Sequence, residues 1–391
     1  MSVKVKTLSL IMTVIMIAGL VPVFAFAKEQ KAPAAKAPVE VRAKASILMD
    51  AATGKVLMAQ NEHEKLPPAS VTKIMTLLLI TEAIDEGKIS LSDVVKTSPA
   101  SASKGGSQIW LKEGETMTVD ELLKAIAIGS ANDASAAMAE HIAGSEEGFV
   151  MMMNERAEEL GMKNTNFENC TGLDDDVKNH VTSAYDIAVM SRELISHEFI
   201  TKYTTVWMDS LRGGETELVN TNKLVRFYDG TTGLKTGTTS KAGHCLSATA
   251  KRGNTHLIAV VLGSENSDDR FEGAKSMLNW GFANYSTIQP EIDSSMVTRV
   301  NILHGVKKSV MPLIPQVTDL LVQSKRKDDI EQKVNLAVDV QAPIEKGQVL
   351  GTIDFLLDGE TIASYNLTSP EKIDKLSFGE AVRKLIQSLG I

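Results

Sequence analysis

Apolar residues follow three different patterns along the chain. Residues 8–26 form an unbroken run without a charge. Between residues 45 and 286, short strand-like runs alternate with longer segments whose apolar positions recur at helical spacing. After about residue 287, the apolar runs are short and rich in β-branched residues. The patterning predicts a mixed domain at 45–286 and a smaller all-β domain at 287–375.

The mixed segment opens with a strand, a turn and a returning strand, because Asp50-Ala51-Ala52-Thr53-Gly54 separates two short apolar runs. A long apolar helix is predicted from Ser70 to Ala83. Further helices are predicted at residues 118–128, 133–142, 149–160, 183–194 and 270–280, with capping sequences at Thr118-x-x-Glu121 and Ser183-x-x-Asp186. Strand-like runs return at 233–250 and 257–263. We expect an α/β (α+β) fold in which an antiparallel sheet is covered by helices.

Strand alternation is clearest near the end of the smaller domain. Apolar or small residues occupy every second position from Val349 to Leu357, and Asp358-Gly359 follows as a two-residue hairpin turn. Together with the runs at 296–304 and 333–340, this pattern predicts a small β-sandwich at 287–375.

The tail at 376–391 returns to helical spacing, with Phe378, Val382 and Ile386 on one side and Glu380 and Arg383 on the other. Two placements fit such an amphipathic helix. It lies on a membrane surface, or it packs on the β-domain as a cap.

The N-terminus has the order of a secretory signal peptide. Lys4 and Lys6 precede the apolar run, and Ala25-Phe26-Ala27 offers a small-x-small cleavage site. We predict a signal peptide at residues 1–27; an uncleaved membrane anchor is the alternative. Residues 28–44, rich in Ala, Lys and Pro, are then a linker. Both readings place the rest of the chain outside the cytoplasm.

Charge and composition exclude several classes of protein. The net charge is −8, and it becomes about −10 once Lys4 and Lys6 leave with the signal peptide, so we expect no nucleic-acid partner. Two cysteines, Cys170 and Cys245, are too few for a disulfide scaffold; one disulfide or two separate buried thiols both fit. The histidines are scattered without a His-Glu-x-x-His sequence, so we expect no metal and no cofactor.

Ser70 and Lys73 form a Ser-x-x-Lys sequence at the start of the predicted apolar helix, one turn apart on one face. The free N–H groups and positive dipole at a helix start favour a developing oxyanion. A lysine removed from water loses its proton more readily and becomes a candidate base. A serine cap with an exposed lysine is the alternative interpretation.

Ser130 and Asn132 lie two residues apart between two predicted helices. In a tight connection both side chains point into one cleft, where a hydroxyl passes a proton and an amide holds a carbonyl and the lysine together. An ordinary helix–helix turn with an N-cap is the alternative.

Lys235, Thr236 and Gly237 begin a strand-like run. The edge of a sheet receives an extended peptide as an added strand. Lys235 and the Thr236 hydroxyl would then hold a free C-terminal carboxylate, and Gly237 would let the ligand approach the backbone. A hairpin turn beside an exposed edge is the alternative.

The three motifs stand in the order that is typical of serine penicillin-recognising enzymes. The segments around them, at 68–76, 129–134 and 233–239, resemble those of low-molecular-mass penicillin-binding proteins. On these residues the chain is identified as a member of the D-alanyl-D-alanine carboxypeptidase family, serine peptidase family S11, over about residues 40–370. The resemblance implies a transpeptidase/β-lactamase-like catalytic domain followed by a small β-domain, with the last helix at the membrane surface.

The resemblance also implies the chemistry. Ser70 would attack the carbonyl between the terminal D-alanines of a peptidoglycan stem peptide, and β-lactams would trap the same serine. The implied roles are proton acceptor for Lys73, proton relay for Ser130 and orientation for Asn132. The implied substrate-binding residues are Lys235, Thr236, Gly237 and Thr238. The backbone N–H groups of Ser70 and Thr238 would form an oxyanion hole.

Two alternative functions fit parts of the same pattern. A class A β-lactamase speeds deacylation with the glutamate of a Glu-x-x-Leu-Asn loop, whereas Leu278-Asn279 is preceded by Lys275 at that position. A wall-binding protein with an inactive site is the second alternative, although every motif residue is present.

Overall fold

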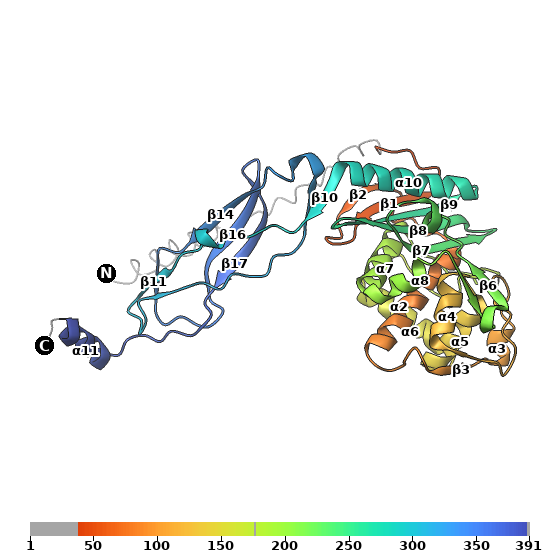
Figure 1. The fold of residues 1–391 in the computed structure, drawn as a ribbon, viewed down its shortest axis with the longest axis horizontal. Coiled ribbons are helices and arrows are strands. Elements are labelled where there is room, and N and C mark those ends of the chain that lie inside the picture. Colours follow the sequence, from red (N-terminus) through yellow and green to blue (C-terminus); the bar gives the residue numbers. More distant parts are fainter. Residues whose placement is uncertain (1–37, 176, 389–391) are drawn as a thin grey trace, which may run out of the picture. The chain divides into compact units, whose positions relative to one another are not determined.

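The computed structural model describes residues 38–175 and 177–388 (Figure 1). The predicted signal peptide at 1–27 and the predicted linker up to residue 37 lie outside the described residues. The described end of that linker is packed, because Val41 is buried against the sheet and the Lys44 N–H donates to the Leu262 carbonyl at 3.0 Å. Ordered packing therefore starts a few residues before Ala45.

A five-stranded antiparallel sheet forms the base of the larger domain, in the strand order β2-β1-β9-β8-β7. Its strands are β1 (Ala45–Asp50), β2 (Val56–Gln60), β7 (Thr231–Thr239), β8 (Gly243–Arg252) and β9 (Thr255–Ser264). The first strand pairs with β9, where Ala45 faces Leu262, so the sheet joins the two ends of the domain sequence. The predicted antiparallel sheet is confirmed, and β7 lies at its edge.

Helices cover both faces of this sheet (Figure 1). On one face, α10 (Ser267–Asn284) packs Phe271 and Met277 into a core shared with Leu257 of β9. The other face carries α2 (Lys73–Asp85) and α7 (Ala184–Ser196), with further helices beyond them. These are α3 (Pro99–Ala102), α4 (Val119–Ala127), α5 (Asn132–Ala143), α6 (Glu146–Glu159) and α8 (Thr201–Thr204), whereas α9 (Leu224–Phe227) packs Leu224 into the core on the α10 face.

The central helix is α2, in which every residue from Lys73 to Thr81 is buried. A helix that is apolar all round is a buried helix, which is what its sequence indicates. The α-helix begins at Lys73 and not at the predicted Ser70, because a 3₁₀ turn, η1 (Ala69–Thr72), comes first. The predicted caps at Thr118 and Ser183 are confirmed.

Two short antiparallel strand pairs were not predicted from the sequence: β3 (Val94–Lys96) with β4 (Thr116–Thr118), and β5 (Met208–Leu211) with β6 (Thr216–Val219). Their strands have three or four residues, too few for alternation to be recognised.

The region after Asn284 consists of strands, as expected. They are β10 (Tyr285–Ile288), β11 (Val300–Leu303), β12 (Ser309–Val310), β13 (Leu320–Gln323), β14 (Glu331–Leu336), β15 (Asp339–Gln341), β16 (Val349–Leu357) and β17 (Glu360–Thr368). One three-stranded sheet has the order β14-β16-β17 and another the order β12-β11-β15. The predicted turn joins β16 to β17, with φ of 56° at Asp358 and 79° at Gly359. The last helix is α11 (Phe378–Ser388).

None of the helices in the described part of the chain is long and apolar enough to cross a bilayer.

Candidate active site

Ser70 and Lys73 meet at the junction of η1 and α2. The Lys73 ammonium lies 3.1 Å from the Ser70 hydroxyl oxygen. One helical turn separates the two residues, so their side chains share a face as the motif predicts. Lys73 is 0% exposed, which rules out the alternative of an exposed lysine beside a serine cap.

The Lys73 ammonium is held by three oxygen atoms. Besides Ser70, it donates to Asn132 Oδ1 at 2.5 Å and to the Thr171 carbonyl at 2.8 Å. Burial lowers the pKa of Lys73 to about 7, partly offset by electrostatic interaction with Cys170 and Asp133. At neutral pH a substantial fraction of this lysine is therefore uncharged and able to accept a proton.

Ser130 lies in the connection between α4 and α5, Asn132 is the first residue of α5, and both are buried. Ser130 has φ of 61°, a left-handed conformation that is uncommon for residues other than glycine. The Asn132 side chain uses both ends: Oδ1 accepts from Lys73, and Nδ2 donates to the Gly105 carbonyl at 2.7 Å. The connection is thus tight, and the amide joins the lysine to a neighbouring loop.

Strand β7 brings Lys235, Thr236 and Gly237 next to the same turn. A Cβ atom on Gly237 would lie 2.8 Å from Ser70 N and 2.9 Å from the Pro68 carbonyl, closer than side-chain carbons approach. Only glycine lets the strand lie so close to η1. The Thr236 hydroxyl donates to Thr221 Oγ1 at 2.7 Å.

Lys235 is a buried cation at 1% exposure. Its ammonium donates to the Thr236 carbonyl at 3.1 Å, and within residues 38–175 and 177–388 no carboxylate forms an ion pair with it. Burial lowers its pKa well below the usual value, and the nearby charges of Lys73 and Arg270 add to this effect. A buried lysine that lies near other basic side chains and has no carboxylate partner among the described residues favours an anionic ligand.

Arg270, from the first turns of α10, was not singled out in the sequence. Its Nη1 donates to the Gly237 carbonyl and to Thr238 Oγ1, both at 3.0 Å. The guanidinium therefore fixes the part of β7 that follows Lys235. The only feature of the local sequence that sets Arg270 apart is its position near a helix N-terminus, where the helix dipole disfavours a positive charge.

The loop that carries Thr171 was also not recognised as part of the site. Asn169 Oδ1 accepts from the backbone N–H groups of Thr171 and Gly172 at 3.1 and 2.7 Å. At Gly172, with φ of 82°, an added Cβ would lie 1.8 Å from the Ala69 carbonyl. Glycine is required here for the loop to reach the Ser70 turn, and tertiary proximity of this kind has no signal in the local sequence.

Cys170 and Cys245 are both buried and form no disulfide with each other. The interpretation as two separate buried thiols is therefore confirmed.

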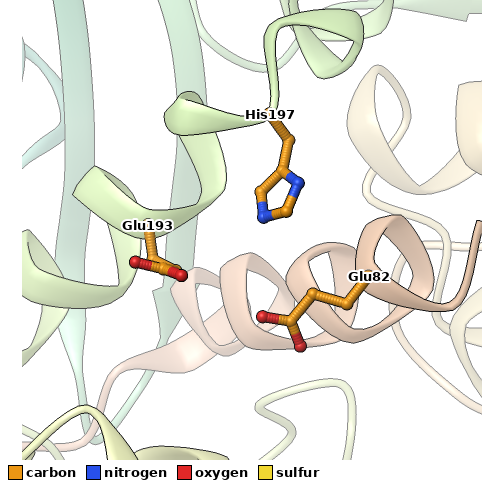
Figure 2. Close-up of side chains that lie close together, drawn as sticks. All are labelled: Glu82, Glu193 and His197. Carbon is orange, nitrogen blue, oxygen red and sulfur yellow. The ribbon is translucent and has the colours of Figure 1, made fainter. Parts of the chain in front are cut away.

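Figure 2 shows Glu82 of α2 with Glu193 and His197 from the end of α7, whose ligand atoms lie near one another. Arg156 Nη2 lies 2.8 Å from a carboxylate oxygen of Glu82 and 2.8 Å from one of Glu193. An arginine of the chain therefore already supplies the positive charge that these carboxylates attract.

Comparison with known proteins identifies the same two domains over most of the chain. The family model of the D-alanyl-D-alanine carboxypeptidases, peptidase S11, matches residues 29–266, and that of the penicillin-binding protein 5 C-terminal domain matches residues 285–375. D-alanyl-D-alanine carboxypeptidase DacF of Bacillus subtilis (strain 168) is 45% identical over 340 residues, which span 86% of this chain and 87% of that protein.

Solved structures agree with the sequence relatives. Penicillin-binding protein 5 from Haemophilus influenzae has a TM-score of 0.77 at 31% identity, covering 87% of this chain and 100% of that one. Penicillin-binding protein D2 from Listeria monocytogenes, solved in an ampicillin-bound form, has a TM-score of 0.58 at 30% identity, covering 62% of this chain and 99% of that one. With its motif residues gathered in one site and the family model spanning more than half of its length, the chain belongs to the D-alanyl-D-alanine carboxypeptidases of serine peptidase family S11.

Proposed function

We propose that the chain is a serine-type D-Ala-D-Ala carboxypeptidase that removes the terminal D-alanine from peptidoglycan stem pentapeptides through an acyl-enzyme on Ser70. The observation that carries the proposal is the buried contact between Ser70 and Lys73, in which Nζ lies 3.1 Å from Oγ and burial lowers the pKa of the lysine to about 7. A general base is most effective when its pKa is near the working pH.

In the acylation step, Ser70 Oγ attacks the carbonyl carbon between the two D-alanines while Lys73 accepts the hydroxyl proton. Asn132 and the Thr171 carbonyl hold the amine in line with Oγ. The carbonyl oxygen of the substrate becomes an oxyanion, which the backbone N–H groups of Ser70 and Thr238 stabilise. The close approach of Gly237 to Ser70 N supports this oxyanion hole, because it brings the β7 backbone beside the serine.

Release of D-alanine needs a proton on its nitrogen as the peptide C–N bond breaks. Ser130 relays the proton from Lys73, and water then hydrolyses the ester on Ser70. The buried position of Ser130, two residues from the Asn132 that binds Lys73, supports this role.

The terminal carboxylate of the substrate binds to Lys235 and Thr236. The substrate carboxylate supplies the negatively charged partner that buried Lys235 lacks among the described residues. Strand β7 lies at the edge of the sheet, where the peptide binds as an added strand. β-Lactams combine a carboxylate with a reactive carbonyl and acylate Ser70 in the same place. The ampicillin-bound Listeria monocytogenes relative supports this extension to inhibitors.

The proposed location is extracytoplasmic, in the cell wall or peripherally at the outer face of the cytoplasmic membrane, after export by the signal peptide. In α11, Phe378, Val382 and Ile386 recur every four residues and are exposed, Phe378 at 87%. An exposed apolar stripe supports a membrane-surface helix over a cap packed on the β-domain.

The test of this function compares residues 28–391 with the Ser70→Ala variant. Each is incubated with a fluorescent penicillin and, separately, with a peptide ending in Lys-D-Ala-D-Ala. Covalent label and released D-alanine are expected for the first protein and neither for the variant. Rapid loss of label without D-alanine would favour a β-lactamase, and a folded protein without label would favour an inactive wall-binding protein.

A further inference from the structure

We infer that Glu146 is a positioning residue for the proposed reaction, because its carboxylate ties together the two loops whose carbonyls hold Lys73 and Asn132. The inference rests on the proposed function, since it gives Glu146 a part in the acylation of Ser70.

The two carbonyls belong to loops and not to helices or strands. Thr171 O accepts from Lys73 at 2.8 Å, and Gly105 O accepts from the Asn132 amide at 2.7 Å. Loops are the softer parts of a fold, so a carbonyl on a loop needs anchoring if it is to hold a base in place. In both loops, the anchored residue is the one immediately before the residue that carries the carbonyl.

Glu146 makes both anchors. Its Oε1 accepts from the Cys170 backbone N–H at 3.3 Å and from the Cys170 thiol at 3.2 Å. Its Oε2 pairs with the Lys104 ammonium. Cys170 precedes Thr171 and Lys104 precedes Gly105, so a single carboxylate lies one residue from each of the two carbonyls. The carboxylate comes from the first turn of α6, where the helix dipole favours a negative charge.

Both partners of this ion pair are shielded, with side chains 18% exposed at Glu146 and 27% at Lys104. Burial alone would raise the pKa of Glu146, but hydrogen bonding to Lys104 and its charge hold that pKa below the usual value. Burial, together with the Glu146 charge, raises the pKa of Cys170 well above the usual value, so the thiol keeps its proton and remains a donor. The arrangement is therefore charged and intact around neutral pH.

Loss of the carboxylate has a defined consequence at Lys73. Freed loops let water reach the ammonium, and because burial is the main cause of its lowered pKa, that pKa rises toward the usual lysine value. The substitution does not replace the other titratable groups that face Lys73, namely Cys170, Asp133 and Lys235. Less of the lysine is then uncharged at pH 7, and its geometry toward Ser70 loosens.

The experiment measures the second-order rate of acylation by a fluorescent penicillin from pH 5 to 9 in the full chain. Glu146→Ala should be acylated about tenfold more slowly at pH 7 than the parent chain. The fall of its acylation rate toward acid pH (the acid limb) should begin at a higher pH than in the parent chain. Glu146→Gln keeps an acceptor for the Cys170 N–H and should recover part of the rate. Glu147→Ala is the matched control, because Glu147 is the exposed next residue of the same helical turn, and it should leave rate and limb unchanged.

The outcomes separate cleanly. A Glu146→Ala protein with the rate and acid limb of the parent chain overturns the inference, as does an equal change in Glu147→Ala. If Glu146→Ala does not fold, Lys104→Gln releases the Gly105 side alone, and an unchanged rate in that folded variant overturns the inference as well. Failure of the parent chain itself to take up label counts against the proposed function and not against Glu146.

Discussion

A Cβ atom placed on Gly237 would lie 2.8 Å from the backbone nitrogen of Ser70. The strand that receives the substrate and the turn that carries the nucleophile are thus in direct backbone contact, and this spacing sets the width of the site. The neighbouring Pro68 carbonyl would be 2.9 Å away, so a side chain at residue 237 has backbone on two sides and little room to move.

We expect Gly237→Ala to push β7 away from Ser70. The acylation rate with a fluorescent penicillin should fall at least about tenfold, because misplacement by about 1 Å costs reactions of this kind one to two orders of magnitude. Gly379→Ala is the control, because a methyl group there meets open space. Equal rates for both variants would contradict the contact.

The acylation rate should depend on pH through Lys73. The base must be uncharged, and burial lowers its pKa to about 7, so the rate should be level above pH 7 and fall about tenfold for each unit below it. Stopped-flow labelling between pH 5 and 9 measures this limb. Lys73→Met should label at a small fraction of the parent rate at every pH. A parent profile without a limb between pH 5 and 9 would count against Lys73 as the base.

Lys235→Met should separate stability from function. The substitution removes a buried ammonium that has no carboxylate partner among the described residues, so the free energy of unfolding should rise by about 1–2 kcal/mol. Binding of a peptide with a free C-terminal carboxylate should weaken at least tenfold. Thermal unfolding and D-alanine release measure the two effects, and a peptide with an amidated C-terminus, which lacks the carboxylate, should show little difference between the two proteins.

Truncation after Lys375 removes α11 and tests its exposed apolar stripe. The share of protein that sediments with membranes should drop, whereas acylation by penicillin should not change. Phe378→Asp, which places a charge at an apolar residue that is 87% exposed, should also reduce the share of protein that sediments with membranes. An unchanged membrane share in the truncated protein would remove the anchor.

The motif residues could be predicted because local spacing sets their neighbours. Three residues in a helical turn bring Ser70 to Lys73, and the tight connection ahead of α5 brings Asn132 to the same lysine. The contributions of Thr171 and Arg270 could not be predicted, because they act through a backbone carbonyl and through a hydrogen bond between α10 and β7, which are distant in sequence. Neither leaves a pattern in the residues around it.

Strand β16 shows a second limit. The sequence alternates from Val349, yet Val349 is 51% exposed and Leu350 is buried, while Ile353 and Phe355 point inward as expected. A register shift between Val349 and Gly351 in the pairing with β17 accounts for the difference, since an extra residue reverses the facing of those before it.

The pairing of β1 with β9 has a consequence for how the chain matures. Ala45 lies opposite Leu262, so β1, beside the central strand of the sheet, pairs with a strand that follows it by more than two hundred residues along the chain. Closing a loop of that length is slow, and a chain emerging N-terminus first cannot complete its sheet until β9 has followed. The edge strand β7 joins the sheet only through β8 and β9, so the contact of the nucleophile turn with Gly237 depends on those two strands as well. We therefore expect the site around Ser70 to form only once β9, which ends at Ser264, is available for pairing.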